Sequence, residues 1–192
     1  MVRVSQDELV AGAIAHRVVS FPTDTVPALA VKPDFAERIY QLKQRSHDKP
    51  LILMGASFED LFPYIKYTPA ELTAWQELID KYWPGALTLV LSASTLVPSE
   101  INSTKSQTVG IRVPNSVIAR QILQQTGVLA TSSANISGRE TLTTMQAIES
   151  AFPNVLVLDL KPPEKMGSGL PSTVVRWQDG EWQILRQGSI TI

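Results

Sequence analysis

Short apolar runs alternate with longer amphipathic stretches along most of the chain. The apolar runs are rich in Val, Ile and Leu and end at proline, glycine or polar clusters, as buried strands usually do. They predict strands over residues 18–22, 51–54, 87–91, 109–113, 128–130 and 155–158. The stretches between them carry apolar residues at helical spacing and predict helices over residues 5–16, 34–43, 68–82, 115–125 and 145–151.

Two of the predicted helices begin with capping signals. Ser5 and Glu8 have the spacing of a capping box, in which each side chain accepts a hydrogen bond from the other residue's backbone N–H. Thr68 and Glu71 repeat this spacing, and Pro69 stands at the first helical position, where its missing N–H costs nothing. These signals place the predicted starts of both helices.

The pattern changes near the end of the chain. Residues 173–177 and 182–186 predict two strands, and the Asp-Gly pair between them is typical of a β-hairpin. Strands that alternate with helices and end in a hairpin predict an α/β fold with a twisted mixed sheet flanked by helices. Residues 161–170 form the only candidate linker, and too few residues follow it to build another domain, so we expect one domain over residues 1–192.

Composition and charge narrow the class of protein. The chain has 192 residues, 44% of them hydrophobic and 18% charged, which is enough apolar material for a folded core. The net charge of −1 gives no long-range attraction to nucleic acid or to anionic lipid. The absence of Cys excludes disulfides, thiolate metal sites and Cys nucleophiles. Asp7 and Glu8 interrupt any signal-peptide pattern and no apolar run could cross a bilayer, so we expect a cytoplasmic protein without membrane contact.

Polar clusters follow three of the predicted strands, where ligands of α/β sheets usually bind. Residues 22–25 form a polar cluster that could equally be a capped turn. Residues 131–138 have more hydroxyl and amide groups than a turn requires, and such groups can hold a phosphate. Between them, Lys43, Arg45 and Lys49 cluster at a predicted helix end and could hold a polyphosphate. Alternatively, these cations belong to a solvated helix terminus.

Several familiar catalytic sites are absent. No glycine loop leads into Gly-Lys-Ser or Gly-Lys-Thr, and no Gly-x-Ser-x-Gly elbow occurs. His16 and His47 are the only histidines and neither lies in a hydrolase-like context. With no cluster of carboxylates, we expect no metal site made of protein side chains alone.

Seven ordered blocks of this sequence are informative together. The first block reads Pro-Thr-Asp-Thr-Val at residues 22–26, and the second is the Lys-x-Arg of the basic cluster. A Trp-Pro-Gly block precedes the strand at 87–91, and a Ser-Ser-Ala-Asn block follows the strand at 128–130. The remaining blocks are residues 109–114, 171–175 and 184–188. Taken together and in this order, they resemble the YrdC-like threonylcarbamoyl-AMP synthase family in its short, single-domain form.

The resemblance implies a fold of the YrdC-like, DHBP-synthase-like type with a concave, positively lined cavity. It implies an L-threonylcarbamoyladenylate synthase, a nucleotidyltransferase that converts L-threonine, bicarbonate and ATP with Mg²⁺ into threonylcarbamoyl-AMP and pyrophosphate. Other tRNA-modification proteins then move the threonylcarbamoyl group to an adenosine of tRNA. Weak binding of double-stranded RNA or tRNA also fits the family.

The same resemblance assigns roles to individual residues. The basic pair that it places in catalysis is Lys43 and Arg45. The expected nucleotide-binding residues are Arg45, Lys49, Thr108, Ser133, Asn135, Thr141 and Arg186. The expected substrate-binding residues are Thr23, Arg112, Thr131 and Ser172. Arg112 and Thr108 lie at even spacing on one predicted strand, so both should face the same side of the sheet.

Three residues at two sites in the chain depart from the family pattern. Pro27-Ala28 stands where the family usually has Tyr-Gly, and Arg176 stands where it usually has Asp. Proline fixes φ, and Ala28 cannot take up the positive φ open to glycine without strain, so we expect an altered path after Asp24 and an altered amino-acid end. An alternative hypothesis is therefore a YrdC-like paralogue that binds nucleotide or RNA without synthase activity.

Overall fold

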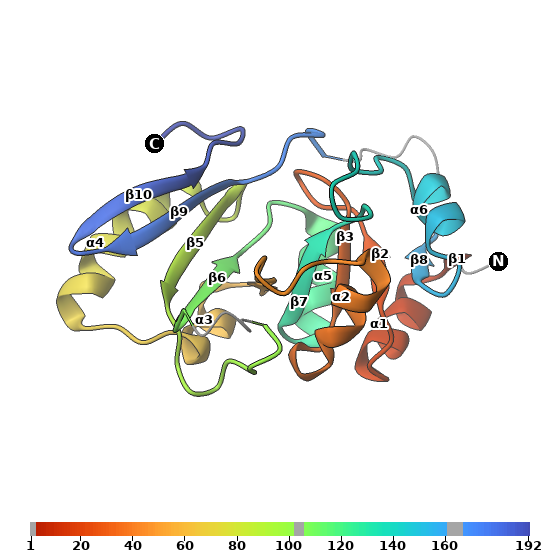
Figure 1. Cartoon of the computed structure of the whole chain (residues 1–192), viewed down its shortest axis with the longest axis horizontal. Coiled ribbons are helices and arrows are strands. Elements are labelled where there is room, and N and C mark those ends of the chain that lie inside the picture. Colours follow the sequence, from red (N-terminus) through yellow and green to blue (C-terminus); the bar gives the residue numbers. More distant parts are fainter. Residues whose placement is uncertain (1–2, 102–105, 161–166) are drawn as a thin grey trace.

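The computed structural model describes residues 3–101, 106–160 and 167–192. Within these ranges one mixed sheet of ten strands passes through the molecule (Figure 1), in the order β1-β8-β2-β3-β7-β4-β6-β5-β9-β10. Its strands are β1 Arg3–Val4, β2 Val19–Phe21, β3 Ala28–Val31, β4 Ile52–Met54, β5 Leu87–Ser92, β6 Thr108–Arg112, β7 Leu129–Ser133, β8 Leu156–Leu158, β9 Thr173–Gln178 and β10 Glu181–Arg186. The helices are α1 Gln6–Ile14, α2 Glu37–Lys43, α3 Phe58–Leu61, α4 Pro69–Tyr82, α5 Val117–Thr126 and α6 Met145–Ala151, with 3₁₀ turns at Pro33–Phe35 and Phe62–Tyr64.

Parallel and antiparallel neighbours are mixed along the sheet. β8 pairs in parallel with β1 and β2, while β7 runs antiparallel to both β3 and β4. β6 is parallel to β4 and antiparallel to β5, and the β9–β10 hairpin joins the sheet through parallel pairing of β9 with β5. The predicted α/β domain with a mixed sheet flanked by helices is confirmed; its extent over residues 1–192 stays a prediction.

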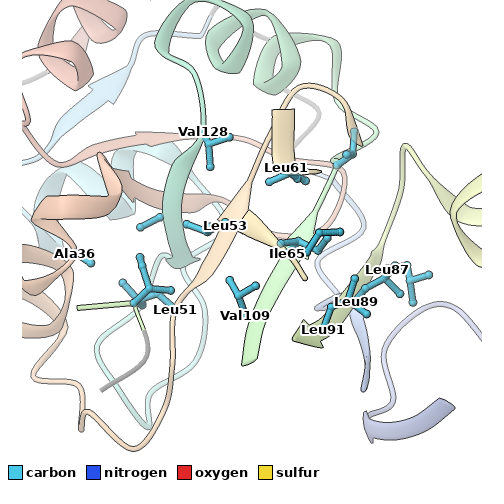
Figure 2. Close-up of a cluster of buried hydrophobic side chains, with 14 of the residues drawn as sticks. Ala36, Leu51, Leu53, Leu61, Ile65, Leu87, Leu89, Leu91, Val109 and Val128 are labelled. Carbon is cyan, nitrogen blue, oxygen red and sulfur yellow. The ribbon is translucent and has the colours of Figure 1, made fainter. Parts of the chain in front are cut away.

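The alternating side chains of β5 separate the core from the opposite face of the sheet. Leu87, Leu89 and Leu91 are completely buried in the largest apolar cluster (Figure 2), which also takes in Trp75 from α4. Thr88 and Val90 point to the other face, because successive side chains of a strand alternate. Burial of one face of β5 therefore fixes which side chains the strand offers to a ligand.

The predicted capping signals form as expected. Ser5 accepts a hydrogen bond from the Glu8 backbone and Thr68 from that of Glu71, with both glutamates bonding back to the cap residue. Ser116 caps α5, and its side chain accepts a hydrogen bond from the backbone N–H of Ala119. Within the described ranges, no helix has the length and apolar character needed to cross a membrane.

Some elements differ from the prediction. β3 was not expected, because its four residues come directly after Pro27 and a polar cluster. Ala28 is extended within it and pairs with Phe21 and Ser133, so this position has no positive φ in this chain. The altered path expected after Asp24 stays a prediction. The candidate linker at 161–170 lies partly outside the described residues.

Candidate functional site

A cavity of about 550 Å³ opens on the face of the sheet opposite the β5 leucines. β3, β4, β5, β6, β7, β9 and β10 all contribute lining residues, as does the loop after α2. Four arginines line it, and among the described lining residues Asp48 is the only carboxylate. The arginines are Arg45, Arg112, Arg176 and Arg186. The cavity is therefore suited to anionic ligands.

Strand alternation explains which residues reach the cavity. Thr108, Gly110 and Arg112 of β6 line it, so the even spacing predicted for Thr108 and Arg112 is confirmed. Gly110 has no side chain on the cavity floor. A Cβ at this position would lie 2.8 Å from Cγ2 of Ile52, so a larger residue would require a shift.

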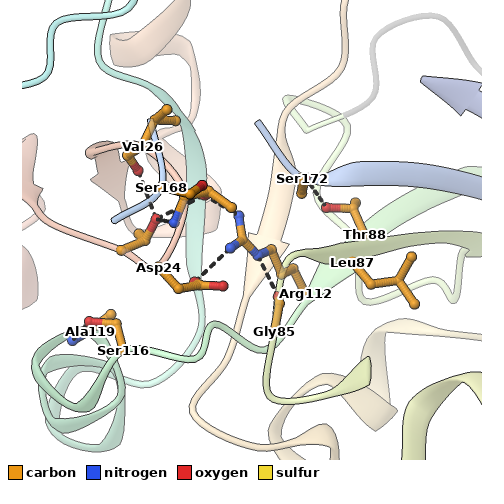
Figure 3. A network of polar contacts seen from close by, with 12 residues as sticks. Asp24, Val26, Gly85, Leu87, Thr88, Arg112, Ser116, Ala119, Ser168 and Ser172 are labelled. Carbon is orange, nitrogen blue, oxygen red and sulfur yellow. Dashed lines mark hydrogen bonds and ion pairs between the residues drawn. The ribbon is translucent and has the colours of Figure 1, made fainter. Parts of the chain in front are cut away.

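At one end of the cavity Arg112 makes a buried ion pair (Figure 3). Its Nη2 lies 2.6 Å from Oδ1 of Asp24, and the two side chains are only 5% and 14% exposed. Nη1 donates to Oγ1 of Thr25 at 2.8 Å and Nε donates to the carbonyl of Gly85 at 3.0 Å. Burial lowers the pKa of Arg112, an effect that Asp24 opposes. Three of the five guanidinium N–H groups are thus engaged by these contacts, and the orientation of the side chain is fixed.

The turn that carries Asp24 is itself held on two sides. Thr23 donates its hydroxyl to the carbonyl of Val26 at 2.7 Å, which closes the turn. The carbonyls of Asp24 and Thr25 accept hydrogen bonds from the backbone N–H groups of Ser168 and of the glycine after it. These contacts join the first polar cluster to the segment that leads into β9.

Ser172 connects three elements at the same end of the cavity. Its hydroxyl lies 2.9 Å from that of Thr88 on β5. Arg186 of β10 donates from Nε and Nη2 to the Ser172 carbonyl at 3.1 and 2.8 Å, and from Nη2 to its hydroxyl at 3.1 Å. Ser172 and Arg186, predicted from different blocks, therefore lie in direct contact.

Lys43 lies beneath the cavity wall and is completely buried. α2 ends at this residue and Gln44 follows in the left-handed region with φ 50°, so the chain turns before Arg45. The Lys43 ammonium donates to the carbonyl of Ser133 and, at 3.0 Å, to Oδ1 of Asn135. The Ser133 hydroxyl donates to the same Oδ1 at 2.6 Å. Lys43 thus holds the polar segment after β7 from behind.

Burial lowers the pKa of Lys43 to about 7, with a further contribution from the charge of Arg45. The unfolded chain keeps this lysine protonated up to about pH 10.5, so the unfolded state binds more protons between these two values and stability should rise with pH. The loss of folding stability caused by burying the charged Lys43 ammonium is fully present below pH 7. We expect the free energy of unfolding to increase by about 2 kcal/mol more from pH 7 to 9 in the wild type than in Lys43→Met.

Urea unfolding of both proteins at several pH values measures this difference. Lys66→Met provides a matched control, since its side chain is exposed and the wild-type pH dependence should persist. Identical slopes in the wild type and Lys43→Met would contradict a depressed lysine pKa.

The structure brings most predicted site residues to the cavity. Those that line it are Thr23, Arg45, Thr108, Arg112, Thr131, Ser133, Thr141, Ser172 and Arg186. Lys43 and Asn135 lie behind this lining, and Lys49 is exposed outside it, although its carbonyl accepts a hydrogen bond from Nε of Arg45 at 2.8 Å. Lining residues without a predicted role include Thr25 and Thr88. Thr88 could have been identified from the sequence, because it is the one polar residue in the apolar run of β5.

No group of three or more metal-ligating side chains occurs within the described part of the chain. A divalent cation would have to be held largely by oxygens of its ligand and by water, which is how Mg²⁺ commonly accompanies phosphates.

Comparison with known proteins supports the family suggested by the sequence blocks. A family model named Sua5_yciO_yrdC, described as telomere recombination, matches residues 14–188. The chain is 33% identical over 180 residues to threonylcarbamoyl-AMP synthase of Pyrococcus abyssi, covering 92% of this chain and 52% of that protein. It is 31% identical over 191 residues to threonylcarbamoyl-AMP synthase of Escherichia coli O1:K1 / APEC, covering 95% and 97%.

A solved structure agrees with these relatives. P. abyssi Sua5 complexed with L-threonine superimposes with a TM-score of 0.84 at 30% identity, covering 97% of this chain and 55% of that one. The chain therefore spans about half the length of the P. abyssi protein, but almost the whole length of the E. coli relative. The match over residues 14–188 and the identities above 30% show that this chain belongs to the Sua5/YciO/YrdC family.

Proposed function

We propose that the chain makes threonylcarbamoyl-AMP and pyrophosphate from L-threonine, bicarbonate and ATP. The observation that carries this proposal is the cavity itself, which combines four arginines with a row of hydroxyl groups. The relatives named threonylcarbamoyl-AMP synthase and the relative complexed with L-threonine support it.

The chemistry explains why such a cavity needs so many cations. The threonine nitrogen and bicarbonate first form a carbamate with loss of water. A carbamate oxygen then attacks the α-phosphorus of ATP, and the bond to the β-phosphate breaks as pyrophosphate leaves with the electron pair. Attacker and target are both anionic, so the site has to position them and offset their repulsion. No side chain has to act as a covalent nucleophile.

Arg112 is proposed to bind the threonine carboxylate. Asp24, Thr25 and Gly85 engage three of its N–H groups, so donors remain for a ligand that approaches from the cavity. Thr23, Thr131 and Ser172 line the same cavity and supply hydroxyl groups for the amino acid.

ATP is proposed to bind along Arg45 and Arg186, with Thr108, Ser133 and Thr141 contacting the nucleotide. Burial lowers the pKa of Arg186, and the positive charge of Arg45 lowers it further. Lys43 and Asn135 are proposed to act indirectly, by holding Ser133 in place. Mg²⁺ would arrive bound to the triphosphate and reduce its charge.

The product is proposed to pass to other tRNA-modification proteins in the cytoplasm, which transfer the threonylcarbamoyl group to tRNA. With a net charge of −1, any direct contact with RNA should be weak, sensitive to salt and confined to the arginine-lined cavity.

Release of pyrophosphate tests the proposed function. We expect wild-type protein with MgATP to release pyrophosphate only when L-threonine and bicarbonate are both present, with threonylcarbamoyl-AMP detected by mass spectrometry. Omission of either substrate is the internal control. Tight ATP binding without turnover would reject the synthase in favour of a nucleotide-binding paralogue, and RNA binding without nucleotide binding would favour a pure binding module.

A further inference from the structure

Arg176 reaches the cavity from the middle of β9. Its register partner on β5 is Val90, which lines the same cavity, and its partner on β10 is Gln183. Val175 and Trp177 on either side belong to the core or pack against it. Alternation along the strand therefore directs the Arg176 side chain to the cavity face.

The Arg176 guanidinium has an incomplete set of partners. Its Nε is buried and has no hydrogen-bond partner among the described residues. By contrast, Arg45, Arg112 and Arg186 each donate to backbone carbonyls or side chains of the cavity wall. Because Nε is buried, an anion in the cavity would meet the terminal N–H groups of this guanidinium, which likewise make no hydrogen bond among the described residues.

The position of Arg176 selects one part of the expected ligand. Arg176 pairs with Val90 of β5, two residues along that strand from Thr88, whose hydroxyl contacts that of Ser172. Arg176 is therefore displaced by about 7 Å along the sheet from the end at which Arg112 and Ser172 sit. Arg186 pairs with Val174, two residues before Arg176, and Arg45 lines the same cavity from the loop after α2. Arg45, Arg186 and Arg176 thus supply cations from three separate elements, with Arg176 away from the amino-acid end.

We propose that Arg176 binds the terminal phosphate of the nucleoside triphosphate and keeps hold of it in the pyrophosphate that leaves. The proposal rests on the proposed function, because it assumes that a triphosphate occupies the cavity. The proposal also explains what the replacement of the family's aspartate by Arg176 would change: an aspartate here would repel the phosphate that the arginine attracts.

Calorimetric titration with ATP, AMP and pyrophosphate tests the proposal on the intact chain. Arg176→Gln should weaken binding of ATP and of pyrophosphate by about 10- to 150-fold, the range for loss of a charge-assisted hydrogen bond. AMP lacks the terminal phosphate, so its affinity should change by less than about twofold. Arg176→Lys keeps the charge without the fork and should show an intermediate loss.

Arg120→Gln is the matched control. Arg120 lies on α5, outside the cavity lining, and its Nε also lacks a partner among the described residues, so its replacement should leave all three affinities unchanged. Thermal unfolding of each variant identifies any loss of the folded state, in which case Arg176→Lys decides the comparison.

The proposal is overturned if Arg176→Gln leaves ATP affinity unchanged, or weakens ATP and AMP equally. A change confined to the KM for threonine would instead place Arg176 at the amino-acid end. Failure of the proposed function is distinguishable, because it appears in the wild type as ATP binding without release of pyrophosphate that depends on threonine. Wild-type protein that binds neither ATP nor pyrophosphate rejects both proposals.

Discussion

Replacement of Arg112 by methionine is expected to lower the free energy of unfolding by about 3–5 kcal/mol, because it leaves a buried carboxylate without its partner. Asp24 is only 14% exposed and lies 2.6 Å from the guanidinium. The substitution also removes donors to Thr25 and to the carbonyl of Gly85, so the turn after β2 loses its link to β6. Urea unfolding at neutral pH measures the loss.

Two further variants separate this effect from a general loss of packing. The double variant Arg112→Met with Asp24→Leu removes both charges, and it should recover much of the lost stability, since an apolar replacement of a buried pair is often neutral. Arg3→Met breaks the more exposed pair of Arg3 with Glu149, 3.0 Å apart, and should cost no more than about 1 kcal/mol. Equal losses in Arg112→Met and Arg3→Met would contradict a special role for the buried pair.

Local signals in the sequence account for most of the fold. The apolar run at residues 87–91 predicted a strand, and capping boxes placed the starts of α1 and α4. β3 was not predicted. It pairs with Val19–Phe21 on one side and with Leu129–Ser133 on the other, and these two partner strands are far from each other in the sequence. A strand this short is stabilised mainly by its neighbours in the sheet, which periodicity does not reveal.

The sequence predicted which blocks of residues contribute to the candidate site, but it did not predict which side chains contact one another there. The sequence predicted a basic cluster after α2, yet Lys43 turns inward and contacts residues 90 positions later, while Arg45 turns toward the cavity. The same limit applies to Arg112, whose partner Asp24 lies 88 positions earlier. Such pairings depend on the order of strands in the sheet, and local spacing carries no information about that order.

Arg45 should be one of the arginines on which ATP binding depends. It lines the cavity from the loop after α2, and its Nε and Nη2 donate to the carbonyls of Lys49 and Pro50 at 2.8 and 3.1 Å. These contacts leave other N–H groups of the guanidinium for phosphate oxygens and hold the fork in one orientation. Arg45→Ala should therefore weaken ATP binding by about 10- to 150-fold, which corresponds to roughly 1.5–3 kcal/mol.

Calorimetric titration with ATP measures this loss, and thermal unfolding shows whether the fold is retained. Arg45→Lys keeps the charge but cannot reproduce the two backbone contacts of the fork, so only part of the affinity should return. Arg38→Ala is the control from α2, the helix that precedes the Arg45 loop, because the Arg38 guanidinium donates to the carbonyl of His16 and its side chain is not part of the cavity lining. Unchanged ATP affinity in a folded Arg45→Ala protein would show that the phosphates of ATP bind elsewhere. A guanidinium that contacts those phosphates inside the cavity would contribute to ATP affinity, so its removal would weaken binding.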